Sequence, residues 1–501
     1  MPFATPPVEG NPAAHSSVQI PQSQIDQAVG YLDAITADIM SRSAVPGVAI
    51  AVVHNDQPVY VKGFGVRKVG TADPVDDQTV FQLASLSKPV GSAVVASVVG
   101  DGKVSWDDPI TKYLPNFALN DPWVSRNVTI ADMYSHRSGL PRAAGDSLED
   151  IGFNRQQILS KLRQLPLGPF RAQYAYANFG LTTGAEAVAA SQHMEWSVLS
   201  KKRLYDPLGM TSTSSNFADF IATPNHAVTH AYVGGKYQPL YVRDPQAQSP
   251  AGGVSSSAVD MAKWLRLELA DGRFGDKQVV APGALQQSRL PQATSNPATT
   301  PDARSSSYGL GIGVSTDQTG RVRYDHSGAF LLGASTVAVL LPSEKLGIVV
   351  LTNGAPQGVP ESIAASFLDI VETGTIGRDW FTAYNKVMQG MYENPSKLAN
   401  KQPPANPAPS APLNALAGTY ANTYYGPAKV SIVDGKLTLT VGPKNLTFPL
   451  THWDGNTYSM MPTGENALGT SAVDFKSPVG GKSPAMTVEF FNTDGLGTFR
   501  R

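Results

Sequence analysis

The stretch Phe81–Val99, FQLASLSKPVGSAVVASVV, holds the only Ser-x-x-Lys pattern of the chain, at Ser85 and Lys88. A short apolar approach at 80–84 leads to the serine, and the small Ala, Val, Gly and Ser side chains that follow suit a closely packed, buried helix. Pro89 fits the first turn of such a helix, where a missing N–H costs nothing. Ser85 and Lys88 therefore lie on one helix face, within side-chain reach of each other.

This pair has the chemistry of an activated nucleophile. A serine hydroxyl is a weak nucleophile unless a base takes its proton, and a lysine whose ammonium is destabilised by burial can be that base. The positive end of the helix dipole also falls at Ser85. Because about one or two copies of so short a pattern arise by chance in a Ser-rich chain of this length, its context has to decide its meaning.

Composition narrows the classes of function. The chain has 501 residues, 42% of them hydrophobic, which is enough to bury a large core in more than one domain. Lys and Arg number 39 against 40 Asp and Glu, so there is no electrostatic footprint for nucleic acid. The absence of cysteine excludes disulfides, thiol catalysis and Cys-ligated metals. We expect no metal and no cofactor.

The beginning of the chain and its apolar runs bear on location. Residues 1–22 are rich in Pro, Ala and Ser, which predicts a disordered tail without the basic start and apolar core of a secretory signal. No apolar run approaches the roughly 18 residues that span a bilayer. We expect a periplasmic or secreted protein if a leader was trimmed, and a cytoplasmic one otherwise.

A series of motifs gives the Ser-x-x-Lys pattern its context. In chain order they are FQLASLSK, DDPITKYLP, VTIADMYSHRSGL, YAYANFGL, YDPLGM, PAGGVSSSAVDMAKWL, YGLGIG, DHSGAFLLG and VVLTNG. Their order resembles that of the serine β-lactamase and penicillin-binding-protein-like hydrolases, in the branch of class C β-lactamases, D-aminopeptidases and β-lactamase-fold esterases. The resemblance covers about residues 25–375. It implies a serine hydrolase with Ser85 as nucleophile and Lys88 as its base.

The second motif of that family is Tyr-x-Asn or Ser-x-Asn. The bare pattern fits residues 125–127, 176–178, 214–216, 392–394 and 420–422. Tyr176-Ala177-Asn178 precedes an apolar helix start, as the family motif does. Since a phenol beside a lysine ammonium can have a depressed pKa, we expect Tyr176 to shuttle a proton between Ser85 and the leaving group. The resemblance implies that Asn178 holds Lys88 and a substrate carbonyl.

The third motif departs from that of the β-lactamases, which carry Lys-Ser/Thr-Gly. Here the matching position holds His326-Ser327-Gly328, followed by Ala329. The resemblance implies that Gly328 lets the substrate backbone approach, and that the N–H groups of Ser85 and Ala329 form an oxyanion hole. Since His326 is largely neutral near pH 7, it is a weaker cation for a β-lactam carboxylate. We therefore rank β-lactamase activity below peptide or ester hydrolysis.

The periodicities agree with the fold that the resemblance implies. Residues 23–41 and 360–373 predict helices, 45–54 and 58–64 a hairpin, and 322–324, 334–341 and 346–352 antiparallel strands. The expected fold class is α/β (α+β), a β-lactamase/transpeptidase-like antiparallel sheet of roughly five strands flanked by helices. We also expect a helical subdomain between residues 85 and about 308, with the site in the cleft between this subdomain and the sheet. This catalytic domain is expected over residues 23–393.

The composition changes after residue 393. Residues 394–412 are rich in Pro and Ala, which predicts an extended linker. Residues 413–501 contain alternating segments, among them a hairpin around Asp434-Gly435. This part resembles the lipocalin-like β-barrel domain that many proteins of the family carry. We expect it to act as a lid, in docking or in forming a homo-oligomer.

Two classes of function remain open. The first is a serine hydrolase that forms an acyl-enzyme with amide or ester substrates, as a peptidase on D-amino-acid-containing peptides or a carboxylesterase. The alternative is a β-lactamase or a catalytically weak penicillin-binding or sensing protein. Usable side chains at all three motif positions favour the enzyme. Its expected partner is a small molecule or a short peptide.

Overall fold

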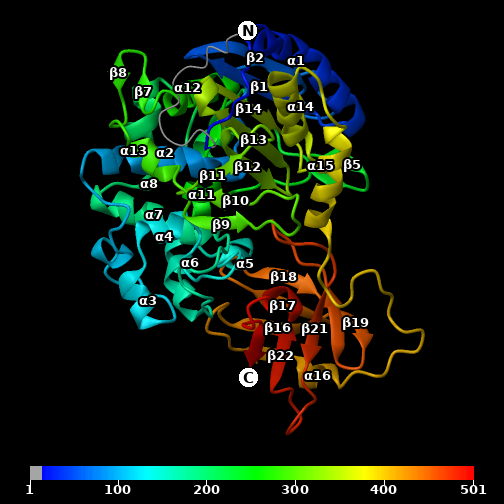
Figure 1. Ribbon diagram of the computed structural model, residues 1–501. Coiled ribbons are helices and arrows are strands. Elements are labelled where there is room, and N and C mark those ends of the chain that lie inside the picture. Colours follow the sequence, from blue (N-terminus) through cyan, green and yellow to red (C-terminus); the bar gives the residue numbers. More distant parts are fainter. Residues whose placement is uncertain (1–13) are drawn as a thin grey trace.

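The computed structural model describes residues 14–501, and a large antiparallel sheet lies at its centre (Figure 1). The sheet has eight strands in the order β2-β1-β14-β13-β12-β11-β10-β9. Their bounds are β1 Gly47–His54, β2 Gln57–Gly65, β9 Ala293–Asn296, β10 Ser306–Tyr308, β11 Gly313–Thr316, β12 Val322–Phe330, β13 Ala334–Leu341 and β14 Leu346–Thr352. The five expected strands are present, and the short β9, β10 and β11 extend the sheet beyond them.

Helices cover both faces of the sheet. On one face lie α1 (Gln22–Ser43) and α14 (Val359–Thr373), which share a buried apolar cluster with β1, β13 and β14. On the other face α12 (Ala258–Leu269) packs against β1 and β14. Every residue of β1 and β14 is therefore buried. The predicted first helix, the β1–β2 hairpin and the helix after the last strand are confirmed.

A largely helical region follows β2 and builds the other side of the site. Its helices are α2 (Ser87–Gly100), α3 (Pro122–Asn127), α4 (Ile130–Tyr134), α5 (Asp146–Asp150), α6 (Arg155–Lys161), α7 (Asn178–Ser191), α8 (Trp196–Ser200), α9 (Asp206–Leu208), α10 (Phe217–Ala222), α11 (Ser249–Gly252) and α13 (Ala284–Ser288). Short strand pairs join them, namely β3 (Phe81–Gln82) with β6 (Ser255–Ser256), β4 (Ala231–Val233) with β5 (Lys236–Gln238) and β7 (Arg273–Phe274) with β8 (Lys277–Gln278).

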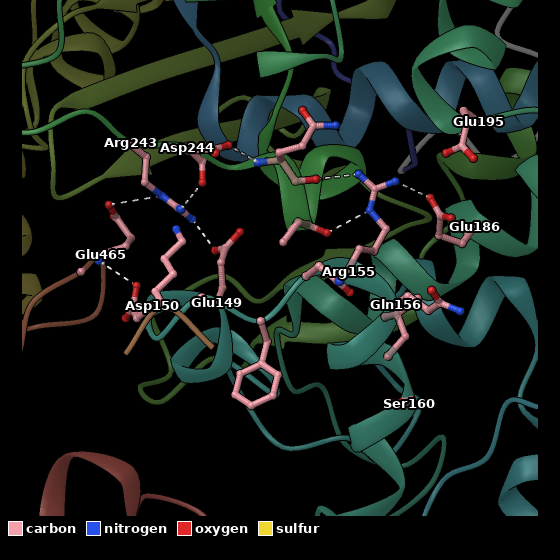
Figure 2. Close-up of a pocket in the computed structure, with 18 of the residues that line it drawn as sticks. Glu149, Asp150, Arg155, Gln156, Ser160, Glu186, Glu195, Arg243, Asp244 and Glu465 are labelled. Carbon is pink, nitrogen blue, oxygen red and sulfur yellow. Dashed lines mark hydrogen bonds and ion pairs between the residues drawn. The ribbon is translucent and has the colours of Figure 1, made fainter. Parts of the chain in front are cut away.

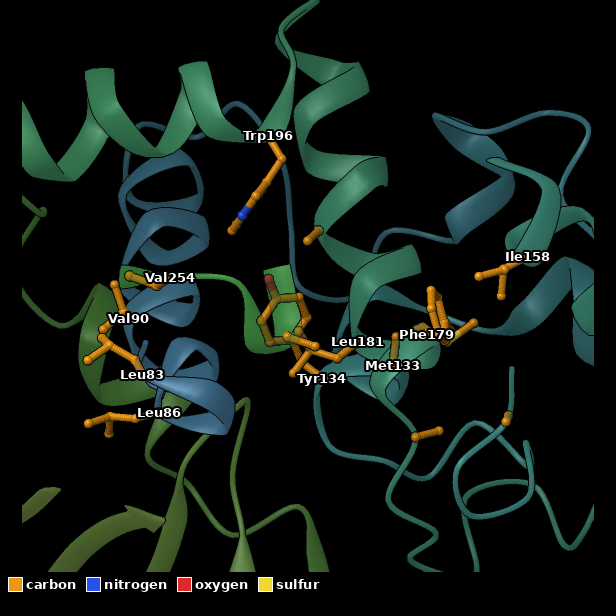
Figure 3. Packing of buried hydrophobic residues seen from close by; sticks show 14 of the residues in the cluster. Leu83, Leu86, Val90, Met133, Tyr134, Ile158, Phe179, Leu181, Trp196 and Val254 are labelled. Carbon is orange, nitrogen blue, oxygen red and sulfur yellow. The ribbon is translucent and has the colours of Figure 1, made fainter. Parts of the chain in front are cut away.

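Helix α2 is buried on all sides, since each residue from Ser87 to Val98 lies in the interior. Its small side chains let other segments approach closely. A Cβ on Gly91, for example, would lie 3.2 Å from the Trp196 ring. Figure 3 shows Val90 beside Leu83, Leu86 and Val254 within this core. The helix that carries Lys88 is thus held by packing from every direction.

The chain after α15 (Trp380–Met388) crosses to a separate set of strands. Residues 394–412 contain no helix or strand. After α16 (Leu413–Leu416), a four-stranded sheet consists of β15 (Gly418–Tyr420), β16 (Ala428–Val433), β17 (Lys436–Val441) and β18 (Leu446–Pro449). A five-stranded sheet consists of β19 (Thr451–Asp454), β20 (Thr457–Met460), β21 (Ser471–Phe475), β22 (Ala485–Val488) and β23 (Thr498–Arg500).

These two small antiparallel sheets meet through a bridge between Ala421 and Arg500. The hairpin predicted around Asp434-Gly435 is confirmed as β16–β17. The expected barrel therefore takes the form of two joined sheets. They lie beside the helical region (Figure 1), and the Lys161 ammonium donates to the Thr423 carbonyl at 3.0 Å.

The described part of the predicted tail is attached to the sheet. The guanidinium of Arg321 donates to the Val18 carbonyl at 2.8 Å, and Ile20 packs against the α1–α14 cluster. Residues 14–21 thus differ from the disordered tail that their composition indicated, because the sheet edge supplies partners for them. The rest of that predicted tail, 1–13, lies outside the described residues.

Candidate active site

The chain bends sharply where Ser85 is placed. Strand β3 leads to a 3₁₀ turn, Ala84–Leu86, that runs directly into α2, so Ser85 lies one turn before the α-helix proper. Ala84 has a φ of 48°, a left-handed conformation that is uncommon for a residue with a side chain. The Thr336 hydroxyl donates to the Leu83 carbonyl at 2.7 Å and ties this turn to β13. Such local strain is typical of functional sites that the surrounding structure holds in place.

Lys88 lies in the interior beside Ser85. Its Nζ donates to Ser85 Oγ at 2.9 Å, to Asn178 Oδ1 at 2.8 Å and to the Ala251 carbonyl at 2.9 Å. The side chain is fully buried, and all three acceptors are uncharged. Three donations use every N–H of an ammonium group. The pair that the sequence predicts is therefore in direct contact.

The surroundings of Lys88 make its ammonium unstable. Burial lowers the pKa of Lys88 from 10.5 to about 7, and the nearby Asp146 carboxyl opposes this fall. An amine with such a pKa is partly neutral near neutral pH. The Lys88 side chain can therefore accept a proton from Ser85.

Tyr176 and Asn178 lie where α7 begins. Lys88 Nζ lies over the Tyr176 ring, 4.5 Å from its centroid. The Asn178 amide accepts from Lys88 and donates to Asp146 Oδ2 at 3.0 Å. The structure thus brings both residues of the second motif to the nucleophile.

One expectation about Tyr176 is wrong. Burial raises the pKa of Tyr176 well above its ordinary value, while the neighbouring Ser85 hydroxyl acts in the opposite direction. The sequence argument considered only the lysine ammonium beside the phenol and left out the burial of the phenol itself, which has the larger effect. The Tyr176 side chain is therefore a neutral phenol, which can donate a proton but is not present as a phenolate.

His326 lies on β12 with both ring nitrogens occupied. Its Nδ1 lies 2.7 Å from the Ser327 carbonyl, and its Nε2 lies 2.7 Å from the Tyr308 hydroxyl. Since a carbonyl can only accept, Nδ1 carries the proton and Nε2 accepts from Tyr308. Burial and then the charge of Lys88 lower the pKa of His326 to about 3. The predicted neutral state of His326 is confirmed.

Gly328 and Ala329 follow on the same strand. A Cβ on Gly328 would lie 2.2 Å from the Leu83 carbonyl oxygen and 2.9 Å from the Leu86 nitrogen. Only glycine lets β12 approach the nucleophile turn this closely. The backbone of Ala329 is consequently held next to the segment that carries Ser85, as the resemblance implied.

Three contributors to the site were not identified from the sequence. Asp146 is the first residue of the short helix α5, whose pattern carries no signal, and Ala251 acts through its backbone carbonyl, which any residue could supply. Tyr308 is part of the YGLGIG motif, but the motif alone does not say that its hydroxyl contacts His326. His136 also packs on Tyr176, with ring centroids 4.4 Å apart, and its Nδ1 accepts from the Ala177 N–H.

Two searches of the described residues bear on other kinds of function. Within residues 14–501, no three or more His, Asp or Glu side chains are grouped so as to hold a metal ion. Every helix in the described part of the chain is too short or too polar to cross a membrane.

Several known proteins resemble this chain in sequence. The unguisins hydrolase ungD' of Aspergillus campestris is 26% identical over 418 residues, covering 79% of this chain and 75% of the relative. Penicillin-binding protein 4 of Amycolatopsis lactamdurans is 28% identical, covering 75% and 93%. The D-alanyl-D-alanine-carboxypeptidase/endopeptidase AmpH of Escherichia coli is 25% identical over 259 residues, covering 50% and 64%.

Solved structures agree on the fold. The octameric penicillin-binding protein homologue from Pyrococcus abyssi has a TM-score of 0.59 at 18% identity and covers 94% of this chain and all of its own. The class C β-lactamase from Rhodobacter sphaeroides has a TM-score of 0.56 at 21% identity, covering 68% and 98%. Both likenesses show the β-lactamase/transpeptidase type of fold.

Family models match two parts of the chain. Residues 402–497 match DUF3471, a domain of unknown function, so the lipocalin-like character of this part stays a prediction. Residues 32–371 match the model described as Beta-lactamase. Because that match covers more than half of the chain, the protein belongs to the beta-lactamase family.

Proposed function

We propose that this protein is a serine hydrolase that cleaves amide or ester bonds through an acyl-enzyme on Ser85. The observation that carries the proposal is the contact between Lys88 Nζ and Ser85 Oγ, at 2.9 Å, with the pKa of Lys88 lowered by burial to about 7. A base matched to neutral pH lies in hydrogen-bond reach of the nucleophile, the arrangement that serine catalysis requires.

The surroundings of Lys88 also orient its lone pair. A neutral amine keeps two N–H groups, and Asn178 Oδ1 and the Ala251 carbonyl can accept both. The lone pair of the Lys88 amine then points toward Ser85 Oγ. Lys88 then takes the serine proton as Oγ bonds to the substrate carbonyl carbon, and the carbonyl oxygen becomes an oxyanion.

The oxyanion is stabilised by the N–H groups of Ser85 and Ala329, a contribution of about 3 kcal/mol for each donor. Collapse of the tetrahedral intermediate breaks the bond to the amine or alcohol, which takes a proton from Tyr176. Lys88 returns its proton to the phenol. Water repeats the sequence on the acyl-enzyme and releases the acid. Gly328, whose missing side chain makes room for the turn that carries Ser85, holds β12 against that turn and differs in this from the substrate access that the resemblance implied.

His326 has a positioning role in this proposal. Its hydrogen bonds to Ser327 and Tyr308 fix the part of β12 that leads to Ala329, the proposed oxyanion donor. The His326 ring carries no charge near neutral pH. A β-lactam carboxylate would find no cation there. This favours D-amino-acid-containing peptides or carboxylic esters over β-lactams, and the peptidase named among the relatives points in the same direction.

A domain division accompanies the proposal, with a catalytic domain over 23–393, a linker over 394–412 and a C-terminal domain over 413–501. The two family matches, 32–371 and 402–497, support it. An octameric structural neighbour makes a homo-oligomer the arrangement to test by light scattering.

The experiment is a panel of nitrocefin, p-nitrophenyl butyrate and D-alanyl p-nitroanilide, combined with labelling by a fluorophosphonate probe. We expect labelling of Ser85, turnover of the ester or the anilide, and slower turnover of nitrocefin. Ser85→Ala should keep the fold and lose both labelling and turnover. Undiminished turnover in Ser85→Ala would contradict the proposal, whereas faster hydrolysis of nitrocefin would overturn only the substrate ranking.

A further inference from the structure

The C-terminal domain reaches the end of strand β12 through one loop, residues 464–466. In this loop the Glu465 carboxyl group accepts from the N–H of Leu331 at 2.5 Å and from that of Leu332 at 3.3 Å. Both donors directly follow β12. A side chain of the C-terminal domain thus binds the backbone two residues after Ala329, the proposed oxyanion donor.

The N–H groups of Ala329 and Leu331 are two positions apart along the chain. Because N–H groups alternate between the two edges of an antiparallel strand, we expect these two on the same edge of β12. Two residues of extended chain span about 7 Å. A shift of the Leu331 backbone would therefore also move the Ala329 N–H.

Phe330, which lies between these two residues, packs on the nucleophile turn. Its buried ring shares a small apolar cluster with Ala84, the residue before Ser85. The Arg243 guanidinium lies over the same ring, 4.9 Å from its centroid, and Arg243 Nε lies 3.7 Å from Glu465 Oε2. The end of β12 is therefore packed between the nucleophile turn and the contact of Arg243 with Glu465.

The loop that carries Glu465 is itself anchored on helix α5. The Asp150 carboxyl group accepts from the Glu465 N–H at 2.9 Å, and from the backbone and side-chain amides of Asn466 at 3.2 and 2.9 Å. Gly464 has a φ of 119°, and a Cβ there would lie 2.5 Å from Asp150 Cγ, so only glycine allows this approach. Figure 2 shows Glu465 beside both Arg243 and Asp150.

Helix α5 connects this anchor to the other side of the site. Its last residue is Asp150 and its first is Asp146, which accepts from the Asn178 amide at 3.0 Å. Asn178 in turn accepts from Lys88. The loop 464–466 therefore bridges two parts of the site that are far apart in sequence, the helix that holds Asn178 and the strand that carries the proposed oxyanion donor.

We propose that Glu465 is a positioning residue, through which the C-terminal domain holds the Ala329 N–H in place for the oxyanion. The bridge keeps the end of β12 fixed relative to α5, so the donor does not have to reorient during the reaction. A donor fixed in advance stabilises the oxyanion more than one that has to move. The inference rests on the proposed function, because the oxyanion forms only if Ser85 is acylated.

The test compares the steady-state kinetics of full-length Glu465→Ala and Glu465→Gln with those of the wild-type protein, on p-nitrophenyl butyrate and D-alanyl p-nitroanilide. Glu465→Ala leaves the N–H groups of Leu331 and Leu332 without this acceptor, whereas Glu465→Gln keeps an oxygen for Leu331. Complete loss of an oxyanion donor costs about a hundredfold to a thousandfold in kcat, so a displaced donor should cost less.

We expect kcat to fall about tenfold in Glu465→Ala, with KM nearly unchanged, because the oxyanion contact is made in the transition state and not in the bound substrate. Glu465→Gln should recover most of the lost rate. A rise in KM at unchanged kcat would instead assign Glu465 to substrate binding and overturn the inference.

Lys161→Ala is the matched control. It also removes a hydrogen bond between the helical region and the C-terminal domain, at the Thr423 carbonyl, but this contact involves neither β12 nor α5. Its kcat should equal that of the wild-type protein. Equal losses in Lys161→Ala and Glu465→Ala, or no recovery in Glu465→Gln, would make Glu465 a general tether of the domain and overturn the inference.

Hydrogen exchange measured by mass spectrometry examines the same strand without any turnover. Glu465→Ala should accelerate exchange in the peptide that covers residues 326–333, and Lys161→Ala should not. Unchanged exchange in Glu465→Ala would overturn the inference, because the end of β12 would then be held without Glu465.

Failure of this inference and failure of the proposed function give different results. Wild-type turnover with an unchanged kcat in Glu465→Ala contradicts the inference alone. A wild-type protein that shows neither turnover nor labelling of Ser85 contradicts the proposed function and with it the role of Ala329, whereas the exchange measurement still decides whether Glu465 holds β12.

Discussion

Lys88 and Arg243 are two buried cations that differ in their partners. Lys88 donates to three uncharged acceptors, whereas Arg243 contacts the carboxylates of Glu149 and Glu465. Burial therefore lowers the pKa of Lys88 to about 7, while the carboxylates hold the pKa of Arg243 above its ordinary value despite burial. Burial makes a base only where no counter-charge restores the cation.

The largest effect is expected when Lys88 is replaced by arginine, the residue type at position 243. Lys88→Arg keeps a cation near Ser85, but a guanidinium cannot lose its proton near neutral pH. We expect kcat/KM to fall by at least about a hundredfold, the scale of losing a general base. Lys88→Ala is the matched control and should lose as much. Near-normal turnover by Lys88→Arg would mean that the positive charge, and not the basicity, is what matters.

A second change removes the phenol above Lys88 and keeps the ring. Tyr176→Phe leaves the burial of Lys88 nearly intact, so its effect reports the proton relay. We expect a loss of about a hundredfold in kcat. If the two residues form one relay, the Lys88→Ala/Tyr176→Phe double variant should be no slower than the slower single variant. Multiplied losses would indicate independent roles.

The free energy of unfolding should depend more on Arg243 than on Lys88, whereas the rate should depend more on Lys88. Arg243→Leu leaves buried carboxylates without a partner and should lower the free energy of unfolding by about 3–5 kcal/mol. Lys88→Met removes a buried group that prefers water but leaves the Asn178 and Ala251 oxygens without a donor, so it should cost less than Arg243→Leu, about 1–3 kcal/mol at pH 7. Thermal unfolding of both variants checks this. A large loss in Lys88→Met would show that Lys88 also stabilises the fold.

The smallest expected effect concerns Asp146. Its carboxylate favours the Lys88 ammonium, but burial raises the pKa of Asp146 to about 8, so near pH 7 it is mostly neutral. Since Lys88 acts as a base only when unprotonated, the rate should rise with pH through about 7. Asp146→Asn should move this rise slightly to lower pH, as pH–rate profiles of kcat/KM would show. A shift to higher pH would contradict the assigned interaction.

The core of the site could be predicted from the sequence because its residues are close along the chain. Ser85 and Lys88 are three positions apart, and His326, Gly328 and Ala329 lie within four consecutive positions of one strand. Such spacings fix geometry once the element is known. The long strands β1, β13 and β14 gave equally clear patterns, whereas only residues 322–324 of β12 were predicted as a strand. The first helix was placed within two residues at each end.

The rest depends on contacts between distant segments. The short β9, β10 and β11 have three or four residues each, too few for an alternation to be visible. Asp146 and Tyr308 lie on the short elements α5 and β10, and Ala251 acts through its backbone carbonyl, so none of the three carries a sequence signal for its role. The depressed pKa expected for Tyr176 was wrong because the burial of the Tyr176 phenol, which raises its pKa, cannot be judged from the order of residues.

The most direct test of the account is the protonation of Lys88 itself. Lysine labelled with ¹³C at Cε reports its own titration by NMR, and the Lys88→Met variant assigns the signal. We predict one lysine signal that titrates near pH 7 in the wild-type protein and is missing from Lys88→Met. If that signal titrates near the ordinary value of 10.5, Lys88 is a cation at neutral pH and cannot be the base that activates Ser85.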